Sequence, residues 1–307
     1  MESLLALSFD NISSRDTTRI KKGLRQIEGL LAQICLVGSR SKGGHKRQQS
    51  TSAQDQDTTP RSLEQVATDP AFREFFRLQE GFDGNGVYCR IVIGTRPSLT
   101  QPVASRLIGC LERVLGMPSS KYLDRKPAKQ RLTCPDDSNN MLISSILDLL
   151  QGVLLLHPPS RTLFRQEIYM NVLLDLLDVA NPSIIQSQAL LVLVSSLLAA
   201  PENTRTFETL DGLWTVASLF KSRSTAKEVK MKVVEFFYFY LMPEATSKAV
   251  KGHQRAPSKR VGSGDREGKQ SATRSTQEKQ QMLGKYMSNV AELVQDLQES
   301  VPFPIAA

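Results

Sequence analysis

Few residues in this sequence have the types and spacing that metal binding requires. Zinc sites draw on Cys and His side chains that are closely spaced along the chain. This sequence contains no Cys-x-x-Cys pair, and its histidines are far apart. The residues concerned are Cys35, Cys89, Cys110, Cys134, His45, His157 and His253. We therefore expect no metal site, and we interpret the cysteines as reduced thiols.

Two pairs of carboxylates and one histidine are the remaining candidates for acid–base chemistry. Asp136 and Asp137 fall in a polar, loop-like stretch, and Asp175 and Asp178 fall on the expected exposed face of a helix. His157 ends an apolar helical stretch, where an imidazole can interact with terminal carbonyls, and no nucleophile is near it in sequence. We interpret the carboxylates as solvated surface and the histidine as structural.

The glycine-rich stretch over residues 81–94 lacks a nucleotide-binding pattern. Gly84 and Gly86 form Gly-x-Gly, but no third glycine has the required spacing and no Lys-Ser or Lys-Thr pair follows. No nucleophile constellation is recognisable either. The sequence therefore predicts a protein that is not an enzyme and that uses no cofactor and no small-molecule substrate.

The net charge of +8 is concentrated in two segments. Residues 37–62 carry a net charge of +3 and residues 244–274 a net charge of +5, so the rest of the chain is neutral overall. Both segments are rich in Gly, Ser, Gln and Lys and poor in apolar residues, which predicts flexible linkers. The alternative is a role in binding nucleic acid or an acidic surface.

Targeting signals are not expected in this chain. Residues 1–9 lack the basic end and apolar length of a signal peptide. No apolar run was expected to reach the roughly 20 residues of a membrane span. These features predict a soluble, cytoplasmic protein without a transmembrane segment.

Leucine-rich amphipathic stretches indicate an all-α fold. Apolar residues recur at steps of three and four from Ile20 to Ile34, which predicts a helix over 19–36 with Asp16 or Thr17 as its N-cap. Similar patterns predict helices over 103–115, 146–156, 189–199 and 227–242. The aromatic end of the last helix is apolar on every side and must be buried.

The central part of the chain contains an internal repeat. Phe207 lies 43 residues after Phe164, and each phenylalanine follows a helix-stopping proline, Pro158 or Pro201, by six residues. Armadillo and HEAT repeats have periods of about 40 to 47 residues, because each unit buries its apolar faces only by stacking on its neighbours. We therefore predict an armadillo/HEAT-like helical repeat solenoid, with repeats over 63–243 and N-terminal helices over 1–36.

A final helix is predicted over 275–299. Ser275 and Glu278 have the spacing of a capping box. Apolar residues then recur at steps of three and four from Leu283 to Leu297. This narrow seam is expected to pack on one neighbouring helix. Either the predicted helix is a terminal cap folded back on the solenoid, or its seam binds a helix of a partner protein.

Several of these motifs together resemble one known family, the fungal septation initiation network component called cell division control protein 14. It is distinct from the phosphatase that shares the name. The motifs that carry the resemblance are residues 23–35 (GLRQIEGLLAQIC), 69–81, 157–161 (HPPSR), 203–207 (NTRTF), 219–225 (LFKSRST) and 239–244 (FYLMPE). The likeness covers nearly the whole chain outside the two linkers.

The resemblance implies a non-catalytic scaffold subunit. Its expected partner is a protein kinase of the germinal-centre class, bound at the spindle pole body during division, in the pathway that triggers septation and cytokinesis. The alternative is a basic helical-repeat protein that binds RNA or an acidic membrane surface, whose affinity would fall steeply with salt. Nucleic acid is the less expected partner.

Residues 84–101 interrupt the family pattern. In that pattern Gly-Phe-acid-Trp-Asn runs directly into Val-Ala-x-Arg-Leu, whereas here these residues intervene and the tryptophan is absent. With the segment removed, Val103 follows Phe76 at the distance that separates Leu173 from Phe164. We hypothesise that the segment is an unspliced intron or a gene-model error; a surface loop is the alternative.

The repeat singles out Trp214, the only tryptophan, as a candidate binding residue. It lies seven residues after Phe207, as Asn171 lies seven residues after Phe164. Tryptophan and arginine are the residues most enriched at interface hot spots. We hypothesise that the kinase partner contacts Trp214, Lys221, Arg223, Lys227 and Lys230. The alternative is that Trp214 fills a groove between repeat units and the basic residues are solvated.

Overall fold

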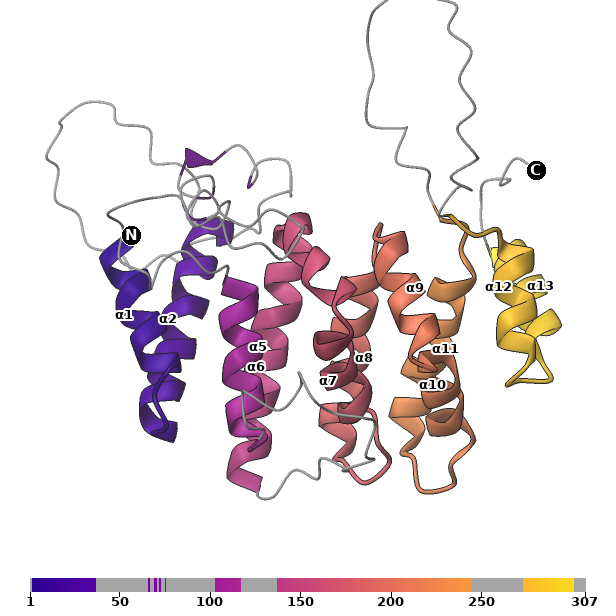
Figure 1. The fold of residues 1–307 in the computed structure, drawn as a ribbon, viewed down its shortest axis with the longest axis horizontal. Coiled ribbons are helices and arrows are strands. Elements are labelled where there is room, and N and C mark those ends of the chain that lie inside the picture. Colours follow the sequence, from indigo (N-terminus) through magenta and orange to yellow (C-terminus); the bar gives the residue numbers. More distant parts are fainter. Residues whose placement is uncertain are drawn as a thin grey trace, which may run out of the picture. The chain divides into compact units, whose positions relative to one another are not determined.

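The computed structural model describes residues 2–36, 66, 69, 70, 72, 75, 103–116, 137–244 and 273–300. All regular secondary structure within these ranges is helical, which confirms the predicted all-α class (Figure 1). The predicted linker over 37–62, the insert over 84–101 and residues 245–272 of the second linker lie outside the described ranges.

The chain divides into two compact units. Unit 1 comprises residues 1–120 and 141–160, and unit 2 comprises residues 121–140 and 161–307.

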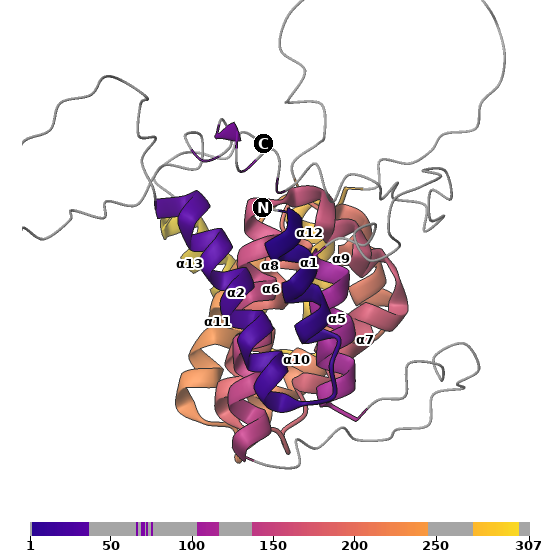
Figure 2. The same ribbon diagram turned by 90° about the vertical axis from the view of Figure 1, so that its left-hand side faces the viewer.

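Unit 1 begins with two antiparallel helices, α1 (Glu2–Ile12) and α2 (Thr17–Leu36), which lie side by side in Figure 2. The predicted cap is confirmed, since the Asp16 carboxylate accepts a 2.9 Å hydrogen bond from the Thr18 backbone N–H. Gly23 allows the two helices to approach closely, because a Cβ atom there would lie 2.7 Å from Ile12 Cγ2 and 2.8 Å from the Ser8 carbonyl oxygen.

The helix α5 (Val103–Val114) packs against α1, as its amphipathic pattern requires. The Arg113 guanidinium donates a 2.8 Å hydrogen bond to the Ile12 carbonyl at the end of α1. The Arg106 guanidinium lies 4.4 Å from the centre of the Phe9 ring, in a cation–π contact. The two arginines thus anchor α5 to α1. In each contact a guanidinium group of α5 finds a partner group on α1.

The helix α6 (Asp137–Leu156) begins nine residues before its predicted start. The apolar pattern did not indicate the true start, because the first residues of the helix are polar. Among the described helices it alone is long and apolar enough to cross a membrane, with a mean hydropathy of 1.4 over Asn139–Leu156. The expectation that no apolar run reaches that length is therefore wrong. A core helix meets the same criterion, and Ile143, Ile146 and Leu150 are fully buried. We interpret α6 as a core helix.

Unit 2 is built from helices that pack in pairs along the chain. The pairs α7 and α8, α10 and α11, and α12 and α13 each make direct contact, and α11 also contacts α8, α12 and α13 (Figure 1). A 3-10 helix, η1, runs across the boundary between the units. The elements are η1 (Pro158–Arg165), α7 (Glu167–Leu176), α8 (Ser183–Leu197), α9 (Pro201–Thr209), α10 (Gly212–Lys221), α11 (Lys227–Leu241), α12 (Thr276–Gly284) and α13 (Val290–Ser300).

Positions that the 43-residue offset pairs are buried in both copies. Phe164 and Phe207 are each fully buried, and so are Leu173 and Val216. The offset also pairs η1 with α9, since Pro158 and Pro201 each begin one of these short helices.

The aromatic end of α11 forms the centre of unit 2. Phe236 packs edge-on against Phe207 with ring centroids 5.6 Å apart, and Tyr240 stacks on Phe236. The prediction of burial is correct for Phe236, Phe237 and Tyr240, but Met242 is exposed at the end of the helix.

The C-terminal region contains two helices rather than the single predicted helix. The capping box at Ser275 and Glu278 is confirmed, but α12 ends at Gly284 and α13 begins at Val290. The break is set by local chemistry, because Asn289 precedes α13 with Glu292 three residues later, the spacing of a second helix start. Both helices contact α11, so the seam packs within unit 2 as a terminal cap.

Candidate functional site

The Trp214 side chain is exposed on the surface of α10, with 55% of its area accessible. The opposite face of α10 is buried through Leu213, Val216 and Leu219, which fixes the direction in which Trp214 projects. Trp214 is therefore not enclosed in the core of unit 2, and its role at an interface stays a prediction. Tryptophan is among the residues most enriched at interface hot spots.

The start of α10 holds this orientation through two backbone features. Asp211 adopts a left-handed conformation with φ of 57°, and Gly212 begins the helix directly against the Phe207 ring. A Cβ atom at Gly212 would also lie 2.7 Å from the Phe207 carbonyl oxygen. The turn between α9 and α10 therefore requires glycine, and it sets the rotation of α10 about its axis.

The four basic residues lie on α10, on α11 and on the turn between them. Lys221 is seven residues from Trp214, so the two share a face of α10. Lys221, Arg223 and Lys227 are exposed, whereas Lys230 is half-buried. None of the four forms an ion pair with a described residue. The turn thus presents cationic groups that the described protein does not neutralise.

Met231 adds a second exposed apolar side chain that the repeat comparison did not single out. It lies on α11 four residues after Lys227, on the same face of that helix, and 56% of its area is accessible. The sequence did contain a signal. It was a Met at an exposed helical position, one turn after a Lys. Apolar and basic side chains therefore occur together on both helices of this pair.

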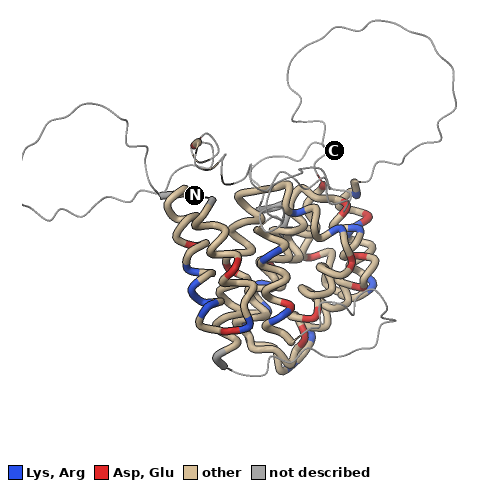
Figure 3. The backbone as a smooth tube through the Cα atoms, turned by 60° about the vertical axis from the view of Figure 1, so that its left-hand side comes forward, with Lys and Arg blue, Asp and Glu red and all other residues tan. Residues whose placement is uncertain are grey.

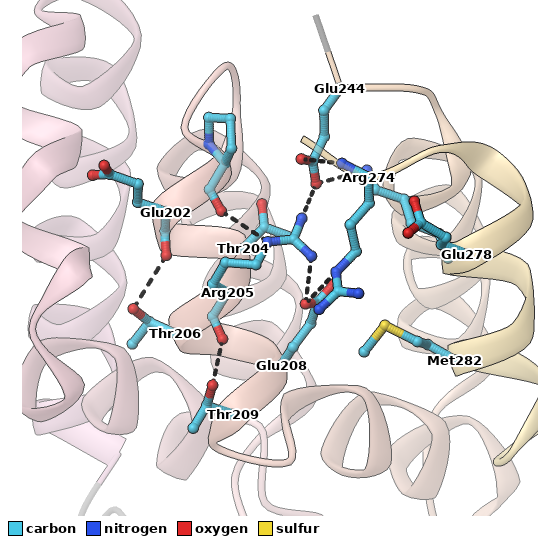
Figure 4. A network of polar contacts seen from close by, with 12 residues as sticks. Glu202, Thr204, Arg205, Thr206, Glu208, Thr209, Glu244, Arg274, Glu278 and Met282 are labelled. Carbon is cyan, nitrogen blue, oxygen red and sulfur yellow. Dashed lines mark hydrogen bonds and ion pairs between the residues drawn. The ribbon is translucent and has the colours of Figure 1, made fainter. Parts of the chain in front are cut away.

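An ionic network whose two carboxylates are largely covered lies at the other end of α11, and no pattern in the sequence indicated it (Figure 4). The Glu208 carboxylate on α9 forms ion pairs with Arg205 at 2.7 Å and with Arg274 at 3.1 Å. Glu244 forms ion pairs with Arg205 and, at 3.2 Å, with Lys279 on α12. Two carboxylates thus face three cations.

The two ends of the predicted linker over 244–274 take part in this network, which corrects the expectation that the whole segment is flexible. The Glu244 side chain is only 9% exposed, and its carboxylate accepts a 3.0 Å hydrogen bond from the Arg274 backbone N–H. A buried carboxylate needs such partners, because its desolvation is otherwise costly. The described ends of the segment are therefore fixed by charge.

Burial shifts the ionisation of the network residues. The Tyr240 hydroxyl donates a 2.8 Å hydrogen bond to Glu208, and burial together with that carboxylate raises the pKa of Tyr240 above its usual value. Burial lowers the pKa of Lys279, and Glu244 opposes that shift. The Lys279 ammonium also donates to the Met242 carbonyl at 2.9 Å. The network residues bind one another and join α9, α11 and α12. We call them the ionic clasp: Arg205, Glu208, Tyr240, Glu244, Arg274 and Lys279.

The remaining residues considered for chemistry have structural surroundings. The His157 ring nitrogen Nδ1 lies 2.7 Å from Ser160 Oγ, and burial lowers the pKa of His157 to about 4. Burial raises the pKa of Cys110 to about 11. Asp175 and Asp178 are half-buried rather than exposed, and Asp178 accepts a hydrogen bond from the Ala180 N–H in the turn after α7. No three His, Cys, Asp or Glu side chains come together as metal ligands within the described ranges.

Comparison with known proteins identifies the family. The model of the family described as "Cell division control protein 14, SIN component" matches residues 1–303 of this chain. The chain belongs to this family. The resemblance inferred from the motifs is thereby confirmed, and membership in the septation initiation network family implies a role in septation and cell division.

A curated member of the family is similar over part of its length. The protein named Cell division control protein 14 of Schizosaccharomyces pombe is 34% identical to this chain over 162 residues. The match covers 53% of this chain and 60% of the yeast protein, which is less than two thirds of its length. No solved structure matches the chain.

Proposed function

We propose that this chain is a non-catalytic scaffold subunit of the septation initiation network that binds a protein kinase of the germinal-centre class. It acts in the cytoplasm, at the spindle pole body during division, and it promotes septum formation and cytokinesis. Membership in the Cell division control protein 14, SIN component family supports the pathway. The exposed Trp214 with its basic neighbours is the observation that carries the binding role.

A scaffold of this kind is consistent with an armadillo-like repeat. Helical repeats stack pairs of helices and offer extended surfaces to protein partners. The pairs α7–α8, α10–α11 and α12–α13, the linking contacts of α11 and the matched burial of Phe164 and Phe207 support this arrangement in unit 2. A repeat solenoid with flexible linkers is the architecture that we propose.

The proposed kinase-binding surface comprises Trp214, Lys221, Arg223, Lys227 and Lys230. A central aromatic anchor surrounded by cations suits a partner surface that combines an apolar pocket with acidic residues. The anchor supplies affinity through burial, and the cations supply orientation and association rate.

The test is co-purification of the tagged protein from dividing cells, comparing Trp214→Ala with Ile184→Ala. Ile184 is the matched control, because it lies on α8 in the same unit and is also 55% exposed. We expect Trp214→Ala to weaken the kinase complex by roughly 2 kcal/mol or more and to leave the melting temperature nearly unchanged. The double reversal Arg223→Glu with Lys227→Glu should slow association.

Three results would contradict the proposal. Equal retention of the kinase by both variants would remove Trp214 from the interface. A large loss of folding stability in Trp214→Ala would return the residue to a structural role. Co-purification of RNA or lipid instead of a kinase, with affinity that falls steeply with salt, would favour the alternative of an RNA or membrane binder.

A further inference from the structure

The first half of α2 carries a cationic surface in unit 1 that the proposed kinase surface does not include. Lys21, Lys22 and Arg25 line a shallow groove together with Thr18 and Gln26, with a volume of about 430 Å³. Figure 3 shows the blue positions of the N-terminal helical pair grouped toward the end of the pair that is away from the marked N-terminus. We define these five residues as the α2 groove.

The packing of α2 directs these cations outward. Ile20, Leu24 and Ile27 form the buried stripe of the helix, with 3% or less of each side chain exposed. Lys22 and Arg25 are three residues apart on the opposite face, and both are exposed. Because Gly23 holds α2 close to α1, the helix cannot rotate to bring the cations against the protein.

The α2 groove has donors but no carboxylate of its own. Lys21, Lys22 and Arg25 form no ion pair with any residue that the structure describes. The nearby Asp16 carboxylate accepts from the Thr18 N–H and hydroxyl at the start of the helix.

Two further features add donor character to the groove. The Gln26 Oε1 atom accepts a 3.0 Å hydrogen bond from Asn11, which leaves the Gln26 amide nitrogen to donate. Thr18 lines the groove from the first turn of α2, where the helix dipole is positive. Both features favour an anion.

The concentration of charge indicates which anion fits. A phosphoryl group carries a charge of about −1.5 to −2 and three acceptor oxygens in one place, and it matches several cations around one hollow. Nucleic acid binding draws on about six to ten phosphate contacts along a track, whereas this groove supplies three cations on two turns of one helix. A membrane surface would attract each cation by about 1 kcal/mol, but its charge is spread over many headgroups and is not concentrated at one hollow.

We propose that the α2 groove binds a phosphorylated peptide segment of a protein partner. Lys21, Lys22 and Arg25 contact the phosphate, and the Gln26 amide donates to it or to the adjacent peptide carbonyl. The segment lies along α2, and the unphosphorylated form of the same segment binds weakly, because most of the attraction comes from the phosphate charge.

The experiment measures binding of the full chain to a fluorescein-labelled peptide library with one fixed phosphoserine and random flanking positions. The triple variant Lys21→Gln, Lys22→Gln, Arg25→Gln should lose about tenfold in affinity, as expected for three exposed charge pairs. The matched control is Arg15→Gln, Arg165→Gln, Lys285→Gln, which removes the same charge from exposed positions outside both the α2 groove and the proposed kinase surface. It should bind the library within about twofold of the unaltered chain. Both triples alter exposed side chains, so equal melting temperatures verify folding.

Each other outcome overturns the proposal. No preference for phosphoserine over the serine library, or equal affinity when glutamate replaces phosphoserine, would leave a general attraction for acidic peptides. Equal losses in the two triples would assign the effect to net charge. Tighter, triple-dependent binding of single-stranded RNA or of phosphatidylserine-containing vesicles would assign the groove to those ligands. The kinase co-purification test does not involve α2, so either proposal can fail alone.

Discussion

The ionic clasp around α12 makes a prediction that separates charge pairing from simple burial. Glu244 faces Arg205, Lys279 and the Arg274 N–H, and only 9% of its side chain is exposed. Glu244→Gln keeps the shape but removes the charge, which leaves three cations around Glu208 alone. Breaking a buried pair on one side costs about 3–5 kcal/mol, and we expect a loss of that order for this substitution.

Lys279→Met should behave differently although Lys279 is as deeply buried, with 5% of its side chain exposed. After this change two arginines still balance two carboxylates, and the cost of burying the ammonium disappears. Replacement of a whole buried ion pair by apolar side chains is often nearly neutral, because no charge is left unbalanced, and the charges that remain here are likewise balanced. We therefore expect a change within about 1 kcal/mol, even though the hydrogen bond to the Met242 carbonyl is lost.

The assay is hydrogen exchange of the α12 amides in the full chain, supported by urea unfolding. The exchange rates report the free energy with which α12 is held on unit 2. Lys285→Met is the matched control, because Lys285 lies at the end of the same helix and is exposed. Equal destabilisation by Glu244→Gln and Lys279→Met would refute the charge-balance reasoning.

Two further predictions concern the packing of α10 and the ionisation of His157. Gly212→Ala should lower stability by about 1–3 kcal/mol in thermal unfolding, because its Cβ would overlap Phe207, whereas Gly152→Ala, at a helical position with open space, should be neutral or stabilising. Burial lowers the pKa of His157 from 6.5 to about 4, so its contribution to stability is present above pH 6.5 and is lost as the pH falls toward 4. The loss is below about 3 kcal/mol, because solvent screens the half-buried ring. The urea midpoint should therefore fall less between pH 7 and pH 4.5 in His157→Gln, and identical slopes would contradict this assignment.

Local signals in the sequence predicted most of the helices and some of their ends. Asp16 and the Ser275–Glu278 capping box could be identified because a cap and its partners lie within three residues. The break between α12 and α13 was missed because apolar residues keep the helical spacing across it. Gly284 and the Asn289–Glu292 spacing were the available signals.

Contacts between distant segments could not be predicted in this way. The clasp joins Glu208, Tyr240 and Lys279 from three helices, and no local pattern connects their positions. The α2 groove could not be predicted from the sequence for a different reason. A net charge summed over a long segment hides it, because carboxylates elsewhere in the chain cancel the positive charge of Lys21, Lys22 and Arg25.

The exposure of Trp214 depends partly on local signals and partly on packing. The 43-residue offset aligns Trp214 with Asn171, which indicates a position that accepts a polar residue. The same alignment also allowed Trp214 to fill a groove between repeat units. The packing of Gly212 against Phe207, together with the buried apolar face of α10, sets the rotation of that helix and so turns Trp214 outward. The two residues of this contact lie two and seven positions before Trp214 along the chain.

The C-terminal helices limit where a partner can bind. Joining residues 244 and 274 closes a chain segment of about 30 residues, which costs roughly 3 kcal/mol of entropy. The nine-residue α12 is too short to be stable alone. Full burial of Leu283 and Val290 against the unit contributes about 1.5–3 kcal/mol for each side chain, and the clasp supplies partners for the charges at the junction. The apolar seam is thus required to hold α12 and α13 on α11. A partner helix could occupy it only by displacing both helices and exposing Glu244 and Lys279. The outward faces of α10 and α2 carry no such cost, and for this reason we assign recognition to them.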